Sequence, residues 1–247
     1  MPEIVTLIGV FLIGIISSII GSLVGGASLL LIPFLIFIGL PPQVAIATDK
    51  FGSIGNALAA FYKFQKAKKI HWKYVPALAI LSLGGSLIGA NILLNINPKI
   101  LQNIIGVILL LLLPLMFLKR GMGVKYSKPT SFKIAIGLVL YFLVQIFSGF
   151  FGGVGPIIFY ILMITFGFTI IEANATQTLP ILVLFISSLM IFALNGIIDY
   201  GVGAVLIIGM AIGGYIGAHI ALKKGDKWVK GLFAILVIIL SIKLLFF

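Results

Sequence analysis

The first glycine cluster of the chain reads Gly21-Ser-Leu-Val-Gly-Gly-Ala-Ser-Leu-Leu-Leu-Ile-Pro33, and a related stretch reads Gly149-Phe-Phe-Gly-Gly-Val-Gly-Pro156. In both, glycines lead to a serine or a proline and then to a short apolar run. Glycine adopts the conformations that end a helix, Ser28 suits an N-cap, and Pro156 suits the first turn of a helix. We therefore predict that a helix breaks in each stretch and that a new helix begins directly after it.

The two stretches belong to an internal repeat. Shifting the sequence by 128 positions aligns them without a gap, and five glycines coincide. These pairs are Gly21/Gly149, Gly25/Gly153, Gly39/Gly167, Gly85/Gly213 and Gly89/Gly217. Such self-similarity indicates duplication. We expect a first transmembrane repeat over residues 1–118, a basic cytoplasmic linker over 119–131 and a second transmembrane repeat over 132–247.

The composition places both repeats in a membrane. The 247 residues are 62% hydrophobic and 9% charged, whereas soluble domains carry about 25% charged residues. Apolar runs of about 20 residues recur along the chain, and each is long enough to cross a bilayer as a helix. This excludes an intrinsically disordered chain, a coiled coil and a nucleic-acid-binding module. The predicted class is an all-α integral membrane protein with about eight to ten helical segments.

Each repeat divides into five apolar segments. The expected segments are 4–24, 28–39, 43–64, 74–94 and 100–118, then 132–151, 156–168, 172–194, 202–222 and 229–247. The second segment of each repeat is too short for a hydrocarbon core about 30 Å thick. We predict that these two segments are half-helices or re-entrant elements.

Charge predicts how the repeats are oriented. The loop around Lys66, Lys68 and Lys69 is basic, whereas its counterpart, residues 195–200, holds no Lys or Arg. The next pair of loops shows the opposite bias, with one Lys in 95–99 and four in 223–230. Basic loops face the cytoplasm, so we predict inverted repeats with both termini outside, the architecture of many secondary transporters.

The new helix N-termini form the first candidate site. Their unpaired N–H groups and the positive end of the helix dipole attract anions. The residues expected to bind solute there are Gly25, Gly26, Ser28, Gly152 and Gly153. The alternative is close helix packing, because glycines four residues apart also let helices approach. Packing is the favoured interpretation for the pairs Gly85/Gly89 and Gly213/Gly217, which lie inside full-length segments.

A second candidate site lies near the start of the third segment of each repeat. Asp49 and Lys50 place opposite charges inside an apolar segment, where a charge costs about 3 kcal/mol or more and marks a functional site. Lys50 would neutralise an anion, and Asp49 would hold Lys50 or take a coupling proton. The polar residues expected beside them are Thr48, Asn174, Thr176 and Gln177, with Asn56 a lesser candidate. The alternative is that Asp49 and Lys50 snorkel or satisfy each other.

These motifs resemble those of the sulfite exporter TauE/SafE family, also called the toluene-sulfonate uptake permease family. The resemblance rests on Val24-Gly-Gly-Ala27, on Gly39-Leu-Pro-Pro-Gln-Val-Ala-Ile-Ala-Thr-Asp-Lys50, and on their counterparts in the second repeat. It extends over essentially the whole chain. It implies a bacterial or archaeal inner-membrane permease for sulfite, organosulfonates or related small anions.

The expected function is therefore an alternating-access secondary transporter for a small anion, and not an enzyme. The sequence contains no P-loop, metal-spaced histidines or catalytic triad, so neither a metal nor another cofactor is expected. The expected partners are the bilayer and the solute, without nucleic acid. A coupling proton or cation and a homo-oligomer are left open. The alternatives are a passive anion channel, a non-transporting assembly or scaffold subunit, and an intramembrane enzyme that uses Asp49.

Overall fold

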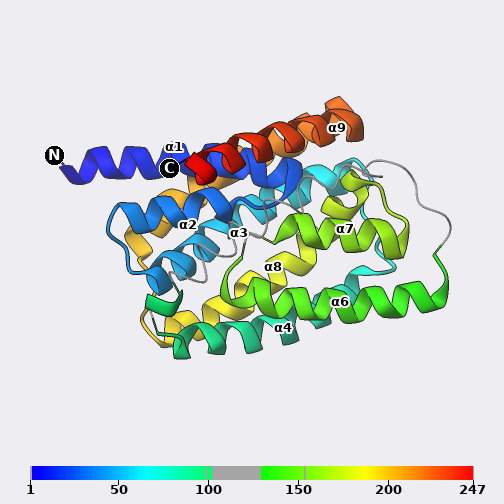
Figure 1. Ribbon diagram of the computed structural model, residues 1–247, viewed down its shortest axis with the longest axis horizontal. Coiled ribbons are helices and arrows are strands. Elements are labelled where there is room, and N and C mark those ends of the chain that lie inside the picture. The colour runs from blue at the N-terminus through cyan, green and yellow to red at the C-terminus, as the bar shows by residue number, and fades with distance from the viewer. Residues whose placement is uncertain (1, 98, 102–128, 153, 247) are drawn as a thin grey trace.

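The structure is a computed structural model that describes residues 2–97, 99–101, 129–152 and 154–246 (Figure 1). Within these ranges the chain folds into helices joined by loops, with no strand, as the sequence predicts. The helices are α1 (Pro2–Val24), α2 (Ser28–Phe37), α3 (Pro42–Lys66), α4 (Val75–Asn95), α6 (Ser131–Phe150), α7 (Gly155–Phe166), α8 (Ile170–Leu194) and α9 (Tyr200–Phe246). Most of the predicted segment 100–118 and of the linker 119–131 lies outside the described residues.

Five helices of the described ranges are long and apolar enough to cross a membrane. They are Ile4–Leu23, Val75–Asn95, Ser131–Phe150, Ile170–Leu194 and Tyr200–Gly225. Helix α3 has 25 residues but is less apolar, because it carries Asp49 and Lys50 and has two lysines in its last turn. Helix α9 contains a non-helical residue, Gly225, with φ 79° and ψ 174°. The chain turns back there (Figure 1), between the two segments predicted from the sequence.

The two short helices are present where the glycine clusters predict them. Helix α2 has 10 residues and α7 has 12, which makes them about 15 Å and 18 Å long at 1.5 Å per residue. Gly25 and Gly26 adopt φ of 81° and 84°, and Gly152 adopts 83°, a region that only glycine enters without strain. Both helices therefore begin at a glycine break and are too short to span the core.

The N-cap prediction for Ser28 is wrong. The N-cap of α2 is Ala27, which makes no side-chain capping hydrogen bond, and Ser28 is the first residue of the helix. The Ser28 hydroxyl instead donates to Asp49 Oδ2 at 2.7 Å. A buried carboxylate on α3 competes for this hydroxyl, so the start of α2 lacks a serine cap. Pro156 lies in the first turn of α7, as predicted.

Helices of the first repeat pack tightly on helices of the second through glycine. A Cβ on Gly209 of α9 would lie 2.7 Å from the Phe11 carbonyl of α1, and one on Gly217 would lie 2.6 Å from the Ile19 carbonyl. A Cβ on Gly85 of α4 would likewise lie 2.7 Å from Gln145 Cβ of α6. The packing interpretation is confirmed for Gly85, Gly89, Gly213 and Gly217, each of which lies in close contact with a neighbouring helix.

The helices run in two directions. Successive contacts between α1 and α9 move toward the C-terminal end of both helices, so these two helices are parallel. Helix α3 runs in the same direction (Figure 1). Helices α4, α6 and α8 run in the opposite direction (Figure 1). Helix α1 is thus antiparallel to α6, its counterpart after a shift of 128 residues, and α3 is antiparallel to α8. The starts of the short helices α2 and α7 meet, because Gly25 and Gly155 approach each other closely.

Candidate functional site

The two glycine breaks touch each other. A Cβ on Gly25 would lie 2.9 Å from the carbonyl carbon of Gly155 and 2.9 Å from the nitrogen of Pro156. Real Cβ atoms do not approach backbone this closely, so any side chain at Gly25 would push the two breaks apart. The close approach therefore places the N-termini of α2 and α7 at one point inside the protein.

A cavity of about 100 Å³ opens beside this contact. An apolar cavity of about 150 Å³ holds benzene, so this one suits a solute with a handful of heavy atoms. Its lining comes from both breaks and from α1, α3, α6, α7 and α8. Of the residues predicted to bind solute, those in the lining are Gly25, Gly26, Ser28, Gly152, Asn174 and Gln177. Gly153 lies outside the described residues.

Both short helices begin at the cavity wall. Ala27 and Ser28 of the first break line it, as do Val154 and Gly155 of the second. The first N–H groups of a helix have no intrahelical acceptor, and the first backbone hydrogen bond of α2 runs from Leu29 N–H to the Gly26 carbonyl, at 3.0 Å. The cavity therefore lies at the positive ends of two helix dipoles, which favour a negative charge.

Gln177 adds an unused hydrogen-bond donor to this wall. Its side chain is 4% exposed, and its Oε1 accepts a hydrogen bond from the Tyr141 hydroxyl at 2.6 Å. Its Nε2 has no partner among the described residues. An unpaired buried amide costs about 1–3 kcal/mol, so this N–H₂ group is poised to gain from a solute that accepts hydrogen bonds.

Asn174 and Ser22 tie the second repeat to the first at the same cavity. Asn174 Nδ2 donates to the Ser22 carbonyl at 2.6 Å. The Ser22 hydroxyl donates to Asn56 Oδ1 at 2.7 Å. All three residues line the cavity. Asn56, a lesser candidate in the sequence, therefore lies at the site, and Ser22 joins it without having been predicted.

The charged pair is buried but does not line the cavity. Asp49 and Lys50 are both 0% exposed, and neither is among the lining residues. The Lys50 ammonium donates to the Gly149 carbonyl in the last turn of α6, and its Nζ lies 5.3 Å from the centroid of the Phe192 ring. Lys50 thus holds α3 against the helix that leads into the second break. Its predicted contact with the solute stays a prediction.

Asp49 lies behind the wall rather than on it. Its Oδ2 accepts from the Ser28 hydroxyl, while its Oδ1 has no hydrogen-bond partner among the described groups. A Cβ on Gly152 would lie 3.7 Å from Oδ2. The carboxyl group therefore holds the start of α2 through Ser28 without itself lining the cavity.

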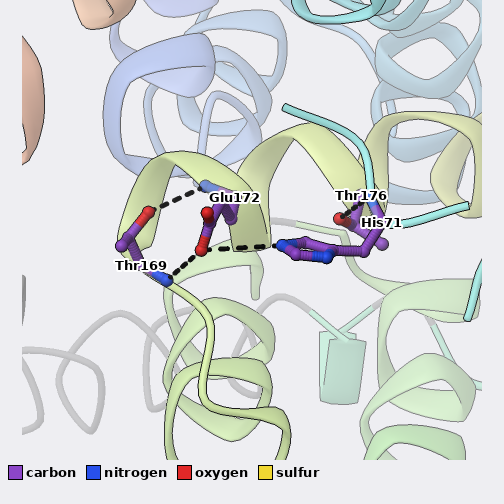
Figure 2. Close-up of polar contacts among 4 residues, drawn as sticks. All are labelled: His71, Thr169, Glu172 and Thr176. Atoms are coloured by element: carbon purple, nitrogen blue, oxygen red, sulfur yellow. Dashed lines mark hydrogen bonds and ion pairs between the residues drawn. The ribbon is translucent and has the colours of Figure 1, made fainter. Parts of the chain in front are cut away.

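Thr48 and Thr176 lie away from the cavity and fasten loops instead. Thr176 Oγ1 accepts from the His71 backbone N–H at 3.1 Å (Figure 2). Thr48 Oγ1 accepts from the Asp199 backbone N–H, also at 3.1 Å. The threonines are 128 residues apart in the sequence, and so are the two loop residues. Each repeat therefore fastens a loop of the other repeat with the same hydrogen bond.

The contact at His71 carries additional side chains. Figure 2 shows Glu172 between Thr169 and His71, with its Oε2 3.6 Å from His71 Nε2. Thr169 and Glu172 form a capping box at the start of α8. The His71 ring stacks on Phe168, with 4.3 Å between ring centroids. The loop before α4 is thus held by the Glu172 side chain and the Thr176 hydroxyl of α8 and by the ring of Phe168 just before that helix.

The polar group that orients Gln177 was not predicted. Tyr141 is fully buried in α6, and its oxygen is also bonded to Ser82 at 2.9 Å and to Gln145 at 2.7 Å. The available signal is the spacing of Tyr141 and Gln145, one helical turn apart in an apolar segment. No group of His, Asp and Glu suited to hold a metal ion occurs among the described residues.

Comparison with known proteins finds relatives along the whole chain. A family model described as "Sulfite exporter TauE/SafE" matches residues 10–244. The chain is 26% identical over 242 residues to the "Probable membrane transporter protein YfcA" of Escherichia coli K12, covering 97% of this chain and 90% of that protein. A "Probable membrane transporter protein" of Haemophilus influenzae is 25% identical over 237 residues, with coverage of 96% and 93%. No solved structure matches significantly.

Proposed function

Because this chain belongs to the sulfite exporter TauE/SafE family, we propose that it is a secondary transporter that moves a small anion across the membrane by alternating access. The solute is sulfite, an organosulfonate or a related sulfur-containing anion. It binds in the cavity between the breaks at Gly25 and Gly155. The localisation is the cell membrane, through which the chain passes several times.

The observation that carries this proposal is the unpaired N–H₂ group of Gln177 in a cavity between two helix N-termini. A cation would meet two positive dipole ends there, and an apolar solute would leave the amide unpaired. An anion gains from both features. The donors are neutral, so binding stays moderate, as transport requires of a site that must also release its solute.

The arrangement of the repeats supports alternating access. Helix α1 is antiparallel to α6, and the Thr48–Asp199 and Thr176–His71 hydrogen bonds exchange under the repeat offset. We interpret this as an inverted repeat whose two-fold axis passes near the cavity. Rocking about such an axis would release one loop contact while it keeps the other, and so open the cavity to one side at a time.

The basic loops favour one orientation in the membrane. Helices α3 and α9 run parallel, and Lys63 Nζ near the end of α3 lies 3.9 Å from the centroid of the Tyr215 ring. The lysines that follow α3 therefore share one face with Lys223 and Lys224 of α9. From the positive-inside rule we infer that this face is cytoplasmic and that Asp199 and both ends of the chain lie outside.

The test is anion binding followed by flux. Purified protein is screened by thermal shift against sulfite, sulfate, thiosulfate, sulfoacetate and small carboxylates, and the anion that stabilises it is followed as a labelled solute into proteoliposomes. We expect stabilisation by a sulfur oxyanion or sulfonate and uptake that saturates and depends on a proton or cation gradient. Uncoupled electrogenic flux would indicate a passive channel. No response to any anion would indicate a scaffold and contradict the proposal.

A further inference from the structure

Two side-chain amides line the cavity, and each uses its carbonyl oxygen to accept a hydrogen bond from a hydroxyl group. Gln177 Oε1 accepts from the Tyr141 hydroxyl at 2.6 Å, and Asn56 Oδ1 accepts from the Ser22 hydroxyl at 2.7 Å. Both amides line the cavity. Because each carbonyl oxygen is occupied by a hydroxyl proton, the N–H₂ group is the part of each amide left for a solute.

The Tyr141 hydroxyl has one proton, which it donates to Gln177 Oε1. Gln145 Nε2 donates to the Tyr141 oxygen at 2.7 Å and also to Ser82 Oγ. Ser82 Oγ lies 2.9 Å from the Tyr141 oxygen, and either hydroxyl could donate in this contact. Because the one Tyr141 proton goes to Gln177 Oε1, we assign the Ser82 hydroxyl as the donor. The chain of donors thus ends at Gln177 Oε1, where the Tyr141 proton goes. This network lies between α4, α6 and α8, fully buried except for Gln177 at 4% exposure.

The second amide is held by an independent contact. Ser22 is 2% exposed, and among the described residues the Asn56 Nδ2 atom makes no hydrogen bond. That atom would lie 3.2 Å from a Cβ on Gly21, which also lines the cavity. Asn174 gives one of the two N–H bonds of its amide to the Ser22 carbonyl, so part of its donor capacity is already used. Two amide donors on two different repeats therefore face the same small space.

We propose that Tyr141 and Ser22 are positioning residues that lock the amides of Gln177 and Asn56 with their N–H₂ groups toward the cavity, which makes the site selective for oxyanions that carry only hydrogen-bond acceptors. The inference rests on the proposed function of this cavity. A sulfonate group accepts from both amides and from the helix N-termini. An ammonium group on the same solute would face N–H groups on several sides and find no acceptor among the two locked amides.

Ethanesulfonate and taurine test this directly, because they share a two-carbon sulfonate and differ by one ammonium group. Affinities for both are measured by calorimetry on the purified full chain. We expect the wild type to bind ethanesulfonate at least about tenfold more tightly, the cost of about one mismatched hydrogen bond. Equal affinities for the two solutes would overturn the inference.

The Tyr141→Phe substitution removes only the hydroxyl, so the Gln177 amide can turn about its terminal torsion, which has two nearly equivalent states. We expect ethanesulfonate affinity to fall about tenfold and the preference over taurine to shrink with it. Ser22→Ala should have the same effect through Asn56, which keeps the test available if Tyr141→Phe does not fold. Unchanged preference in the folded variants would overturn the inference.

Ser187→Ala is the matched control. Ser187 is a buried serine of α8 whose hydroxyl pairs with Ser86, and it does not line the cavity. Ser187→Ala also removes a buried hydroxyl and should lower stability. Its preference between the two solutes should nevertheless stay at the wild-type value. If the wild type binds neither sulfite, ethanesulfonate nor taurine, the proposed function itself fails, a result distinct from a preference that Tyr141→Phe leaves unchanged.

Discussion

Asp49 and Gln177 occupy equivalent positions of the two repeats, 128 residues apart, and so do Lys50 and Thr178. In the first repeat the position carries a charge and is buried behind the cavity wall. In the second it carries a neutral amide and lines the cavity. The charged copy serves the fold, through Ser28 and Gly149, while the neutral copy faces the cavity.

The difference follows from the energetics of burial. A buried charge must be satisfied permanently, because an uncompensated one costs several kcal/mol. Lys50 meets this requirement by donating to the Gly149 carbonyl, a partner that is always present, whereas Asp49 has a partner for Oδ2 in Ser28 and none for Oδ1 among the described groups. A neutral amide that is left unpaired costs about 1–3 kcal/mol, a penalty the protein can carry while the cavity is empty. Under the proposed function, Gln177 would alternate between an unpaired state and a solute-bound state.

The largest expected effect is on stability, at Lys50. Lys50→Met leaves the Gly149 carbonyl without this donor and Asp49 without its neighbouring cation, so unfolding free energy should fall by about 3–5 kcal/mol. Thr178→Val is the matched change in the second repeat. Among the described residues the Thr178 hydroxyl bonds to the Ala175 carbonyl of its own helix, so a loss of about 1 kcal/mol is expected. Unfolding in SDS, followed by circular dichroism, compares the two.

A Lys50→Met protein as stable as Thr178→Val but unable to bind anion would contradict this division of roles. It would return Lys50 to the solute-binding site, as the sequence predicts.

The next effect is on affinity, at Gln177. Gln177→Leu removes the unpaired donor, so the Kd for the anion found in the screen should rise about 5–150-fold, the equivalent of 1–3 kcal/mol. Asp49→Asn, the matched change in the first repeat, keeps an acceptor for Ser28 and should not weaken binding. Calorimetry at one pH measures both. The reverse ranking, with Asp49→Asn the more damaging, would mean that the charged copy contacts the solute.

The smallest effects are at the loop contacts, where the repeats are most alike. Thr48→Val and Thr176→Val each remove an acceptor from a backbone N–H, worth about 1 kcal/mol. Amide hydrogen exchange should accelerate about fivefold at Asp199 in Thr48→Val. The acceleration at His71 in Thr176→Val should be smaller, because the Glu172 pair and the Phe168 stack still hold that loop. Equal acceleration at both loops would show that these side chains add no protection.

The fold could be predicted closely because the bilayer constrains it. Apolar length locates the helices, and the glycine clusters locate the breaks, since few residues other than glycine adopt the φ of Gly25 and Gly152. The site was harder to predict. Because they are charged, Asp49 and Lys50 were predicted to bind the solute. A sequence does not show which face of α3 lines a cavity. Tyr141 and Ser22 act through amide oxygens on other helices, contacts that no local pattern encodes.

Locating a bound oxyanion tests the central claim most directly. Selenite has the shape and charge of sulfite, and selenium scatters X-rays anomalously, so crystals grown with it would show the anion as an anomalous peak. The account predicts that the peak lies in the cavity, within hydrogen-bonding distance of Gln177 Nε2 and Asn56 Nδ2, and disappears in Gln177→Leu. A peak only at surface lysines, or one bound to Lys50 behind the cavity wall, would contradict it.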